Sequence, residues 1–290
     1  VWEEILIHLS EAVQIISLSA TVSNAEEFGE WLQTVRGDTE VIVSEIRPVP
    51  LYQHVLFGNR LLDLFGEDAK LNPELTRLER DSYRQVRGNW QSKAKGPKPL
   101  SRSEIVEKLE RESLLPAITF IFSRNNCDAA VRQCLTAGLR LTNTQERSDI
   151  RSVIARNMKN LAQEDLVVLG YYEWADALER GIAAHHAGLL PAFKVTVEEL
   201  FQRGLVKAVF ATETLALGIN MPARTVVLEK LSKWNGEGHV AISPGEYTQL
   251  TGRAGRRGID IEGNAVILWG NDLDSTSVGG LASTRTYPLK

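Results

Sequence analysis

The chain has 290 residues, a formal net charge of −4 and a hydrophobic fraction of 43%, values typical of a soluble globular protein with one large or two modest domains. The slightly acidic balance excludes a general coating of nucleic acid, so contact with a polyanion must come from local patches. No run is long and apolar enough to span a bilayer, and the opening VWEEILIHL does not look like a signal peptide. We therefore expect a cytoplasmic protein with no membrane partner.

The first 46 residues read as alternating strands and helices. Ile15–Leu18 is an apolar run that predicts a short buried strand, which ends at Ser19-Ala20-Thr21. A capping box of Ser23 and Glu26 then begins a helix, and Glu40–Ser44 alternates like a second strand. Because the opening residues look like the middle of a helix, we expect the chain to start inside a domain.

The chain turns polar from about Asn59 to Arg102. The RPVPL segment at 47–51 cannot be helical, because each proline restricts itself and the residue before it. The stretch at 88–102 is rich in Gly, Pro, Lys and Ser, which is typical of an exposed, partly disordered linker. Its lysines could contact phosphate, but charge runs usually face water, so we favour a solvated loop there. We interpret the whole of 47–115 as a linker that is partly exposed or disordered. These lysines are Lys93, Lys95 and Lys98.

From residue 116 onward, apolar strands alternate with helices. Continuous apolar runs predict strands at 117–122, 182–185, 206–210, 225–229 and 263–269. Residues 139–181 read as a helical insertion, and Pro191 suits the first turn of a helix that ends near Gly204. Strands alternating with helices predict an α/β fold, in which helices cover both faces of a parallel, doubly wound sheet.

Cys127 and Cys134 are the two cysteines of the chain. They are seven residues apart in a predicted helix, so both face the same apolar stripe. A disulfide across two helical turns is sterically poor. We therefore expect two reduced core thiols in a cytosolic protein, rather than a redox or metal pair.

The stretch QLTGRAGRRGID at 249–260 holds three arginines in a mildly acidic chain. A capping box of Ser243 and Glu246, with proline at the first helical position, predicts a helix start just upstream. On that helix Gln249, Arg253 and Arg256 fall at i, i+4 and i+7 and lie on one stripe. The predicted helix presents an amide and two guanidinium groups to one target.

The target of such a stripe is predicted to be a phosphate group, which guanidinium forks bind bidentately. Gly252 and Gly255 lie beside the arginines and allow another surface to approach the backbone closely. The alternative is a solvated basic helix face. A glycine-poor helix would suit that purpose better, because each interior glycine costs about 1 kcal/mol relative to alanine.

Small polar residues stand where three predicted strands end: Ser19-Ala20-Thr21, Ser123-Arg124 and Thr212-Glu213-Thr214. Ligands of parallel sheets bind beyond the carboxyl ends of the strands, and hydroxyl groups near helix N-termini suit phosphate oxygens. Helix capping is the alternative for Ser123 and Thr212, since Ser and Thr are common caps. Together the three strand ends predict one crevice.

Four segments resemble the motifs of superfamily-two helicases. LSAT at 18–21 is similar to motif III, FIFSR at 120–124 to motif IV, VFATETLALGINMPARTVV at 209–227 to motif V, and QLTGRAGRRG at 249–258 to motif VI. Motif V and the GIAAHHAGLLP segment at 181–191 resemble the superkiller-type (antiviral) DExH-box RNA helicases. LSATVSNAEEFGEWL and RPVPLYQHVLFG look most like the actinobacterial HelY-like branch of that family.

The resemblance implies a fold built from RecA-like domains. It assigns 1–46 to the end of a first RecA-like domain, 47–115 to a linker, 116–272 to the second RecA-like domain, and 273–290 to the start of a connector. The sequence contains neither a GxxxxGK[ST] P-loop nor a DExH box, which family members carry in the first domain. The resemblance therefore implies a truncated motor core, and we expect the isolated chain to be inactive.

Roles at the nucleotide also follow from the resemblance. It implies that Arg253 and Arg256 are arginine fingers for the γ-phosphate of ATP, and that Gln249 positions that phosphate or the attacking water. The residues it places near the nucleotide and the domain interface are Gly218, Asn220 and Gly252. DEAD-box relatives usually carry Asp where this chain has Asn220, which puts a ribose contact at that position in doubt.

Roles at the nucleic acid follow in the same way. The resemblance implies that Ser19, Ala20 and Thr21 couple the ATP state to domain closure. The residues it places along the nucleic-acid strand are Ser123, Arg124, Thr212, Glu213 and His186. His186 is interpreted either as such a contact or as an interior histidine with satisfied partners. Adjacent His185 and His186 are poorly spaced for one metal, so we predict no metal site.

The family therefore implies an ATP-dependent RNA helicase that moves 3′ to 5′ along single-stranded RNA. Its cofactors would be ATP and Mg²⁺, held mainly by the first RecA-like domain, and its partners would include that domain and RNA-degradation machinery. A DNA repair helicase of the related class is an alternative, because phosphate contacts do not report the 2′-hydroxyl. For the isolated chain, a non-catalytic nucleic-acid-binding module is another.

Overall fold

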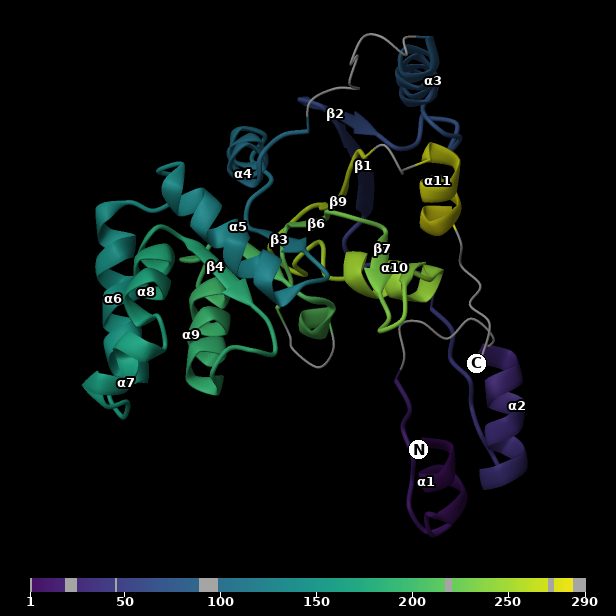
Figure 1. The fold of residues 1–290 in the computed structure, drawn as a ribbon. Helices are drawn as coiled ribbons and strands as arrows, with labels where there is room; N and C mark the ends of the chain where they lie inside the picture. Colours follow the sequence, from purple (N-terminus) through teal and green to yellow (C-terminus); the bar gives the residue numbers. More distant parts are fainter. Residues whose placement is uncertain are drawn as a thin grey trace.

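The computed structural model describes residues 2–18, 25–44, 46–88, 99–216, 221–270 and 274–283. Its centre is a seven-stranded sheet with the strand order β2-β1-β9-β6-β3-β5-β4 (Figure 1). The strands are β1 (Leu51–Phe57), β2 (Arg60–Asp63), β3 (Ala117–Phe120), β4 (Ile182–His185), β5 (Ala208–Ala211), β6 (Thr225–Leu228) and β9 (Gly263–Leu268). Neighbours pair in parallel except β2, which is antiparallel to β1. The predicted parallel α/β sheet is confirmed.

Helices cover both faces of this sheet. Because successive side chains of a strand point to opposite faces, Ile182 and Phe210 pack with one set of helices, and Ala183 and Val209 pack with the other. The first set is α4 (Arg102–Arg111) and α5 (Arg124–Thr136). The second set includes α3 (Pro73–Gly88), α9 (Pro191–Gln202), α10 (Pro244–Thr251) and α11 (Ser275–Ser283).

The predicted helical insertion consists of α6 (Thr144–Met158), α7 (Gln163–Val168) and α8 (Tyr171–Glu179). It joins the core because Trp174 of α8 stacks on Phe193 of α9, with ring centroids 4.1 Å apart. Cys127 and Cys134 are fully buried and unpaired on α5, and burial raises the pKa of each thiol to about 12. The prediction that both thiols lie in the core is confirmed.

The segment expected to be a linker, 47–115, supplies part of the sheet instead. Leu51–Leu56 pair with Gly263–Leu268 of β9 along their whole length, and β2 pairs with β1. Helix α4 buries Ile105 and Leu109 against Val227 and Val266 of the sheet. The linker interpretation is therefore wrong for these residues, while 89–98 lie outside the described residues.

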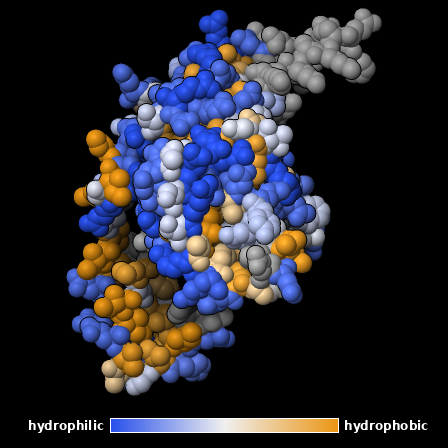
Figure 2. Space-filling view, turned by 90° about the vertical axis from the view of Figure 1, so that its left-hand side faces the viewer, coloured by the Kyte–Doolittle hydropathy of each residue, from blue (hydrophilic) through white to orange (hydrophobic). Residues whose placement is uncertain are grey.

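The two helices α1 (Trp2–His8) and α2 (Ala25–Arg36) lie apart from the sheet, at the bottom of Figure 1. Arg36 ties them together by donating to the carbonyl groups of Leu9, Ser10 and Val13. The strands predicted at 15–18 and 40–44 do not form: neither segment has regular secondary structure. A strand needs a neighbour for its backbone groups, and neither segment pairs with another described segment. Apolar side chains gather on this lobe in Figure 2.

Candidate nucleotide and nucleic-acid site

The carboxyl ends of β3, β5 and β4 meet at one edge of the sheet. The register places Phe120 beside Ala211, and Ala211 beside His185, so the residues that follow these strands come together. Among them are Ser123 after β3, Thr212 after β5 and His186 after β4. Three of the expected nucleic-acid positions therefore share the edge at which parallel sheets bind ligands.

Ser123 and Arg124 begin helix α5 at this edge. Ser123 is the N-cap, and its hydroxyl accepts the N–H of Asn126 at 3.4 Å. A hydroxyl that accepts one bond can still donate its own hydrogen, so capping leaves a donor for a phosphate oxygen. Arg124 is exposed, and a Cβ added to Gly188 would lie 3.6 Å from its Cδ. Arg124 therefore borders the loop that follows His186.

Thr212 begins the strand-end loop, residues 212–216, which contains the 3-10 helix η1 (Glu213–Ala216). The Thr212 hydroxyl is 2.9 Å from that of Thr214, and its N–H donates to the carbonyl of His185 at 3.3 Å. Glu213 forms an ion pair with Lys233 at 2.7 Å. The loop is thus held by backbone, hydroxyl and charge contacts together.

Lys233 lies on a separate hairpin of β7 (Ser232–Trp234) and β8 (His239–Ala241). Its ammonium group also lies 2.6 Å from Oε1 of Glu246 on α10. Hydrogen bonds to Glu213 and Glu246 raise the pKa of Lys233. One cation therefore joins the strand-end loop, the hairpin and the first turn of α10.

Both histidines of the AHHAG segment are interior side chains with partners. His186 Nδ1 accepts the N–H of Gly188 at 3.1 Å, so Nε2 carries the proton that it shares with Asp128 at 3.0 Å. His185 Nε2 lies 2.8 Å from Glu198, and burial lowers the pKa of His185. The arrangement matches the interior interpretation of His186 more closely than a direct strand contact.

Helix α10 starts as predicted but ends earlier than predicted. Ser243 and Glu246 form the expected capping box, and the helix ends at Thr251 with Gly252 as its C-cap. Gln249 is half-buried in the last turn, while Arg253 and Arg256 follow the helix. The prediction that Gln249, Arg253 and Arg256 share one helical stripe is wrong.

Residues 252–260, here called the arginine loop, leave the helix because their backbone pairs with a neighbouring segment. Ala254 forms a bridge with Ala223, and Ala223 exchanges backbone hydrogen bonds with Arg253 at 2.9 Å and Gly255 at 2.7 Å. Gly255 has φ +85°, which ordinary L-residues adopt only with strain. Gly255 thus allows the backbone to change direction sharply after the helix.

The two predicted arginine fingers are held in different ways. The Arg253 guanidinium donates to the carbonyl of Ala216, at the end of the strand-end loop, and burial lowers the pKa of Arg253. Arg256 forms a fork with Asp260, with Nε–Oδ2 and Nη2–Oδ1 both at 2.8 Å. Asp260 was not identified from the sequence, although an acid four residues after an arginine is a recognisable pairing signal.

The RPVPL segment at 47–51 packs against the arginine loop and the start of β9. Arg47 donates from Nε to the carbonyl of Val49 at 2.9 Å and from Nη2 to that of Ala254 at 2.5 Å. The carbonyl of Pro50 accepts the N–H of Gly263 at 2.8 Å. Sequence reasoning missed this contact, because nothing in a proline-rich segment identifies a partner that is 207 residues away.

Several expected site residues lie outside the described residues. They are Ser19, Ala20 and Thr21, expected to couple the ATP state to closure, and Gly218 and Asn220, expected near the nucleotide. Gly252 is described, and a Cβ there would lie 2.8 Å from the carbonyl oxygen of Thr248. Gly252 is thus in close contact with the preceding helical turn.

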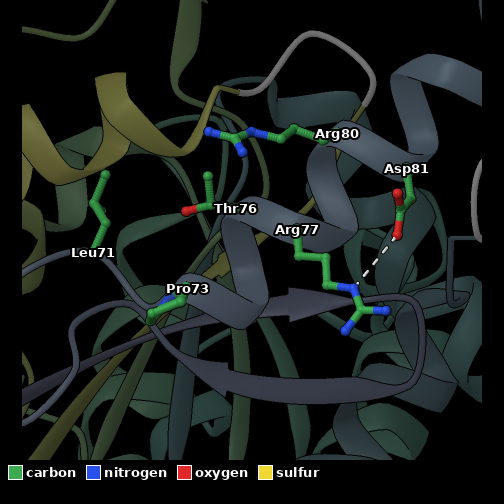
Figure 3. Close-up of a pocket in the computed structure, with 6 residues that line it drawn as sticks. All are labelled: Leu71, Pro73, Thr76, Arg77, Arg80 and Asp81. Atoms are coloured by element: carbon green, nitrogen blue, oxygen red, sulfur yellow. Dashed lines mark ion pairs between the residues drawn. The ribbon is translucent and has the colours of Figure 1, made fainter.

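A cavity of about 620 Å³ opens beside α3, away from these residues. Figure 3 shows Leu71, Pro73, Thr76 and Arg80 around it, with Arg77 turned toward Asp81 at a Nε–Oδ2 distance of 4.0 Å. Its lining shares no residue with the candidate site. Among the described residues, none of the helices is long and apolar enough to cross a membrane, and His, Cys, Asp and Glu nowhere gather in a group of three suited to a metal ion.

Comparison with known proteins gives the class of the chain. The family model described as "Helicase conserved C-terminal domain" matches residues 129–258, which hold the strand-end loop and most of the arginine loop. The seven-stranded sheet is the RecA-like arrangement expected of such a domain. The chain thus contains the C-terminal RecA-like domain of a superfamily-two helicase.

Three relatives narrow the class to a family. "Probable helicase HelY" of Mycobacterium tuberculosis is 60% identical over all of this chain and 34% of that protein. "Superkiller complex protein 2" of Homo sapiens is 38% identical over 92% of this chain and 23% of that protein. "Exosome RNA helicase MTR4" of Homo sapiens is 37% identical over 100% of this chain and 28% of that protein. These similarities support a superkiller-like superfamily-two helicase fragment, and the chain spans about a third or less of the length of these relatives.

Proposed function

We propose that the chain is the C-terminal half of the motor core of an ATP-dependent RNA helicase. The observation that carries the proposal is the packing of the arginine loop on the strand-end loop. The Arg253 guanidinium donates to Ala216 of that loop, whose first residue is Thr212. The loop that would face the nucleotide thus contacts the loop that would face the strand, which gives a direct route between hydrolysis and strand movement.

ATP is the substrate in this proposal, and its hydrolysis supplies the free energy for movement. A first RecA-like domain, with a P-loop and a DExH box, would hold most of the triphosphate and the Mg²⁺. Gln249, Gly252, Gly218 and Asn220 would border the nucleotide from this chain. The guanidinium group of Arg256 fits a phosphate oxygen, because Nη1 has no acceptor among the described residues. Arginine fingers contribute roughly 10³–10⁵ in rate.

The nucleic-acid strand would lie along the carboxyl edge of the sheet. Ser123, Arg124 and Thr212 offer hydroxyl and guanidinium donors to the phosphate backbone, which is read without regard to base sequence. Glu213 would position the strand-end loop through Lys233, and His186 would support the loop beside Arg124. Closure and opening of the two domains, coupled through Ser19, Ala20 and Thr21, would move the protein 3′ to 5′.

The assignment of RNA rests on the relatives rather than on the phosphate contacts. The names of two relatives contain "superkiller complex" and "exosome RNA helicase". We infer single-stranded RNA as the strand, RNA-degradation machinery as the partner class, and the cytoplasm as the site of action. A matched pair of RNA and DNA oligonucleotides tests the first of these, since stimulation by DNA alone would contradict it.

The test of the proposal is ATP hydrolysis by the full-length protein, with and without single-stranded RNA. Arg256→Ala should lower the stimulated rate by roughly 10³-fold or more. Arg257→Ala is the matched control, because Arg257 is an exposed neighbour on the same loop with no salt bridge to a described residue. Equal rates for the two variants would contradict the proposal.

A further inference from the structure

Asp260 holds the guanidinium group of Arg256 in one plane. Nε donates to Oδ2 and Nη2 donates to Oδ1, both at 2.8 Å, which is the bidentate geometry of a strong arginine–carboxylate pair. The backbone N–H of Arg256 donates to Oδ2 as well, at 2.9 Å. One carboxylate therefore fixes both the base and the tip of the arginine side chain.

The backbone closes the same turn. The N–H groups of Ile259 and Asp260 donate to the carbonyl of Arg256 at 3.1 and 2.9 Å, and Gly258 supplies the left-handed conformation with φ +78°. The Asp260 side chain is 4% exposed and that of Arg256 is 22% exposed. The acid is thus buried within the turn, and the arginine is on the solvent side of the pair.

The fork leaves part of the guanidinium group for a ligand. A guanidinium has five N–H donors, and Asp260 accepts one from Nε and one from Nη2. No described residue accepts a hydrogen bond from Nη1. An anionic oxygen that approaches this side would meet an arginine whose plane is already set, so less side-chain entropy is lost on binding.

We propose that Asp260 is a positioning residue that orients Arg256 toward the phosphates of the nucleotide. This inference rests on the proposed function, since it requires Arg256 to act on phosphate. Asp260 acts only through Arg256, because its own charge would repel a phosphate group. The pair fits this role chemically: burial alone would raise the pKa of Asp260, but the hydrogen bonds from Arg256 outweigh it and hold that pKa below its ordinary value.

Asp260→Asn in the full-length protein tests the inference, because it keeps the shape and removes the charge. We expect kcat for RNA-stimulated ATP hydrolysis to fall roughly 10- to 100-fold, the size of a misplacement effect. KM for ATP and the RNA concentration for half-maximal stimulation should stay within about two-fold, since the orientation would act in the transition state. Glu262→Gln is the matched control. The Glu262 side chain is 43% exposed, and its contact with Arg224 is long, at 3.9 Å.

Two further measurements separate positioning from a structural role. In the background of Arg256→Ala, Asp260→Asn should slow hydrolysis no further, because residues that act through each other are not additive. In the 290-residue chain, the Arg256 Nε–H should exchange slowly by NMR and should exchange at least about 10-fold faster in Asp260→Asn. In the Glu262→Gln control, the Arg256 Nε–H should still exchange slowly.

The outcomes distinguish this inference from the proposed function. If Arg256→Ala is inactive but Asp260→Asn matches the wild type or exceeds it, the proposed function stands and the positioning role is overturned. If Arg256→Ala is fully active, the proposed function itself fails. Additive losses in the double variant, or rapid Nε–H exchange in the wild type, also overturn the positioning role.

Discussion

At the scale of single residues, the direction of the arginine loop depends on Gly255. Gly255 has φ +85°, and a Cβ on it would lie 2.7 Å from Cγ1 of Val49 and 3.3 Å from Cα of Gly263. The loop could not yield without moving either the RPVPL segment or the start of β9. The path of the loop that carries Arg253 and Arg256 thus depends on the packing of Gly255 as well as on the arginines' own contacts.

Gly255→Ala should therefore destabilise the chain more than Gly258→Ala. Both glycines have positive φ, so both substitutions cost roughly 1–2 kcal/mol in backbone strain. Only Gly255→Ala adds overpacking, roughly 1–3 kcal/mol more, because nothing lies within 4 Å of a Cβ at Gly258. Urea unfolding of the two variants measures the difference, and equal losses would show that the loop yields freely.

Residue chemistry was predicted from the sequence better than residue contacts were. The buried thiols and the capping box of Ser243 and Glu246 follow from local periodicity and composition, and the structure has both. The fork of Arg256 and Asp260 lies beyond the end of the helix at Thr251. That end depends on the pairing of Ala254 with Ala223, a tertiary contact that overrides local helix propensity.

At the scale of secondary-structure elements, Lys233 connects the hairpin of β7 and β8, the strand-end loop and helix α10. Its ammonium group lies 2.7 Å from Glu213 in the strand-end loop and 2.6 Å from Glu246 in the first turn of α10, and its side chain is 21% exposed. In the part of the chain that the structure describes, no further strand pairs with the hairpin of β7 and β8. This ion pair network is therefore a main anchor that aligns the hairpin with both loops.

Lys233→Met should lower the free energy of unfolding by roughly 1 kcal/mol near pH 7, as for a partly exposed ion pair network. The pKa of Lys233 is raised from 10.5 by its hydrogen bonds to Glu213 and Glu246. Its contribution to the free energy of unfolding is therefore fully present below pH 10.5, and it is lost as pH rises through the higher pKa of the folded state. Glu246 has its pKa lowered from 4.5: burial would raise it, but hydrogen bonds from Lys233 and Ser243 outweigh burial. The contribution of Glu246 to the free energy of unfolding is fully present above pH 4.5, and it is lost as pH falls through the lower pKa of the folded state.

The difference between wild type and Lys233→Met should therefore be largest between about pH 5 and pH 10 and shrink on further acidification. Urea unfolding across this range measures it. Lys70→Met is the control, because the Lys70–Asp68 pair is largely exposed on both sides. A difference that is independent of pH would show that Lys233 stabilises through its alkyl chain instead.

The elements that sequence analysis found and missed have a physical explanation. Strands β3, β4, β5, β6 and β9 are buried on both faces, so they read as continuous apolar runs. Strand β1 mixes polar and apolar residues and has a graded burial pattern. Its place in the sheet comes from pairing with β9, more than 200 residues later, which no local pattern reveals.

The whole molecule consists of a well-packed sheet and a smaller lobe with exposed apolar residues. Ile16, Leu18 and Ile42 are 80%, 93% and 82% exposed, although the sequence predicts buried strands at 15–18 and 40–44. Their sequences are strand-like, yet no described segment pairs with them. Exposed apolar segments with strand-like sequences favour pairing with another chain.

Hydrogen exchange should report this division within one chain. Amides of 15–18 and 40–44 should exchange rapidly, while those of β3, β5, β6 and β9 should be the slowest, since protection follows burial and hydrogen bonding. Light scattering should show self-association that increases with concentration. A sharp monomer peak together with full protection of both segments would contradict the expectation.

The central claim is that the arginine loop acts on ATP in response to a bound strand. ATP hydrolysis by the full-length protein, with and without single-stranded RNA, tests it most directly when Arg256→Ala and Arg257→Ala are measured beside the wild type. We expect RNA to stimulate hydrolysis by the wild type, Arg256→Ala to lose that stimulated rate by orders of magnitude, and Arg257→Ala to retain it. No hydrolysis by the wild type, or an Arg256→Ala variant as active as the wild type, would contradict it.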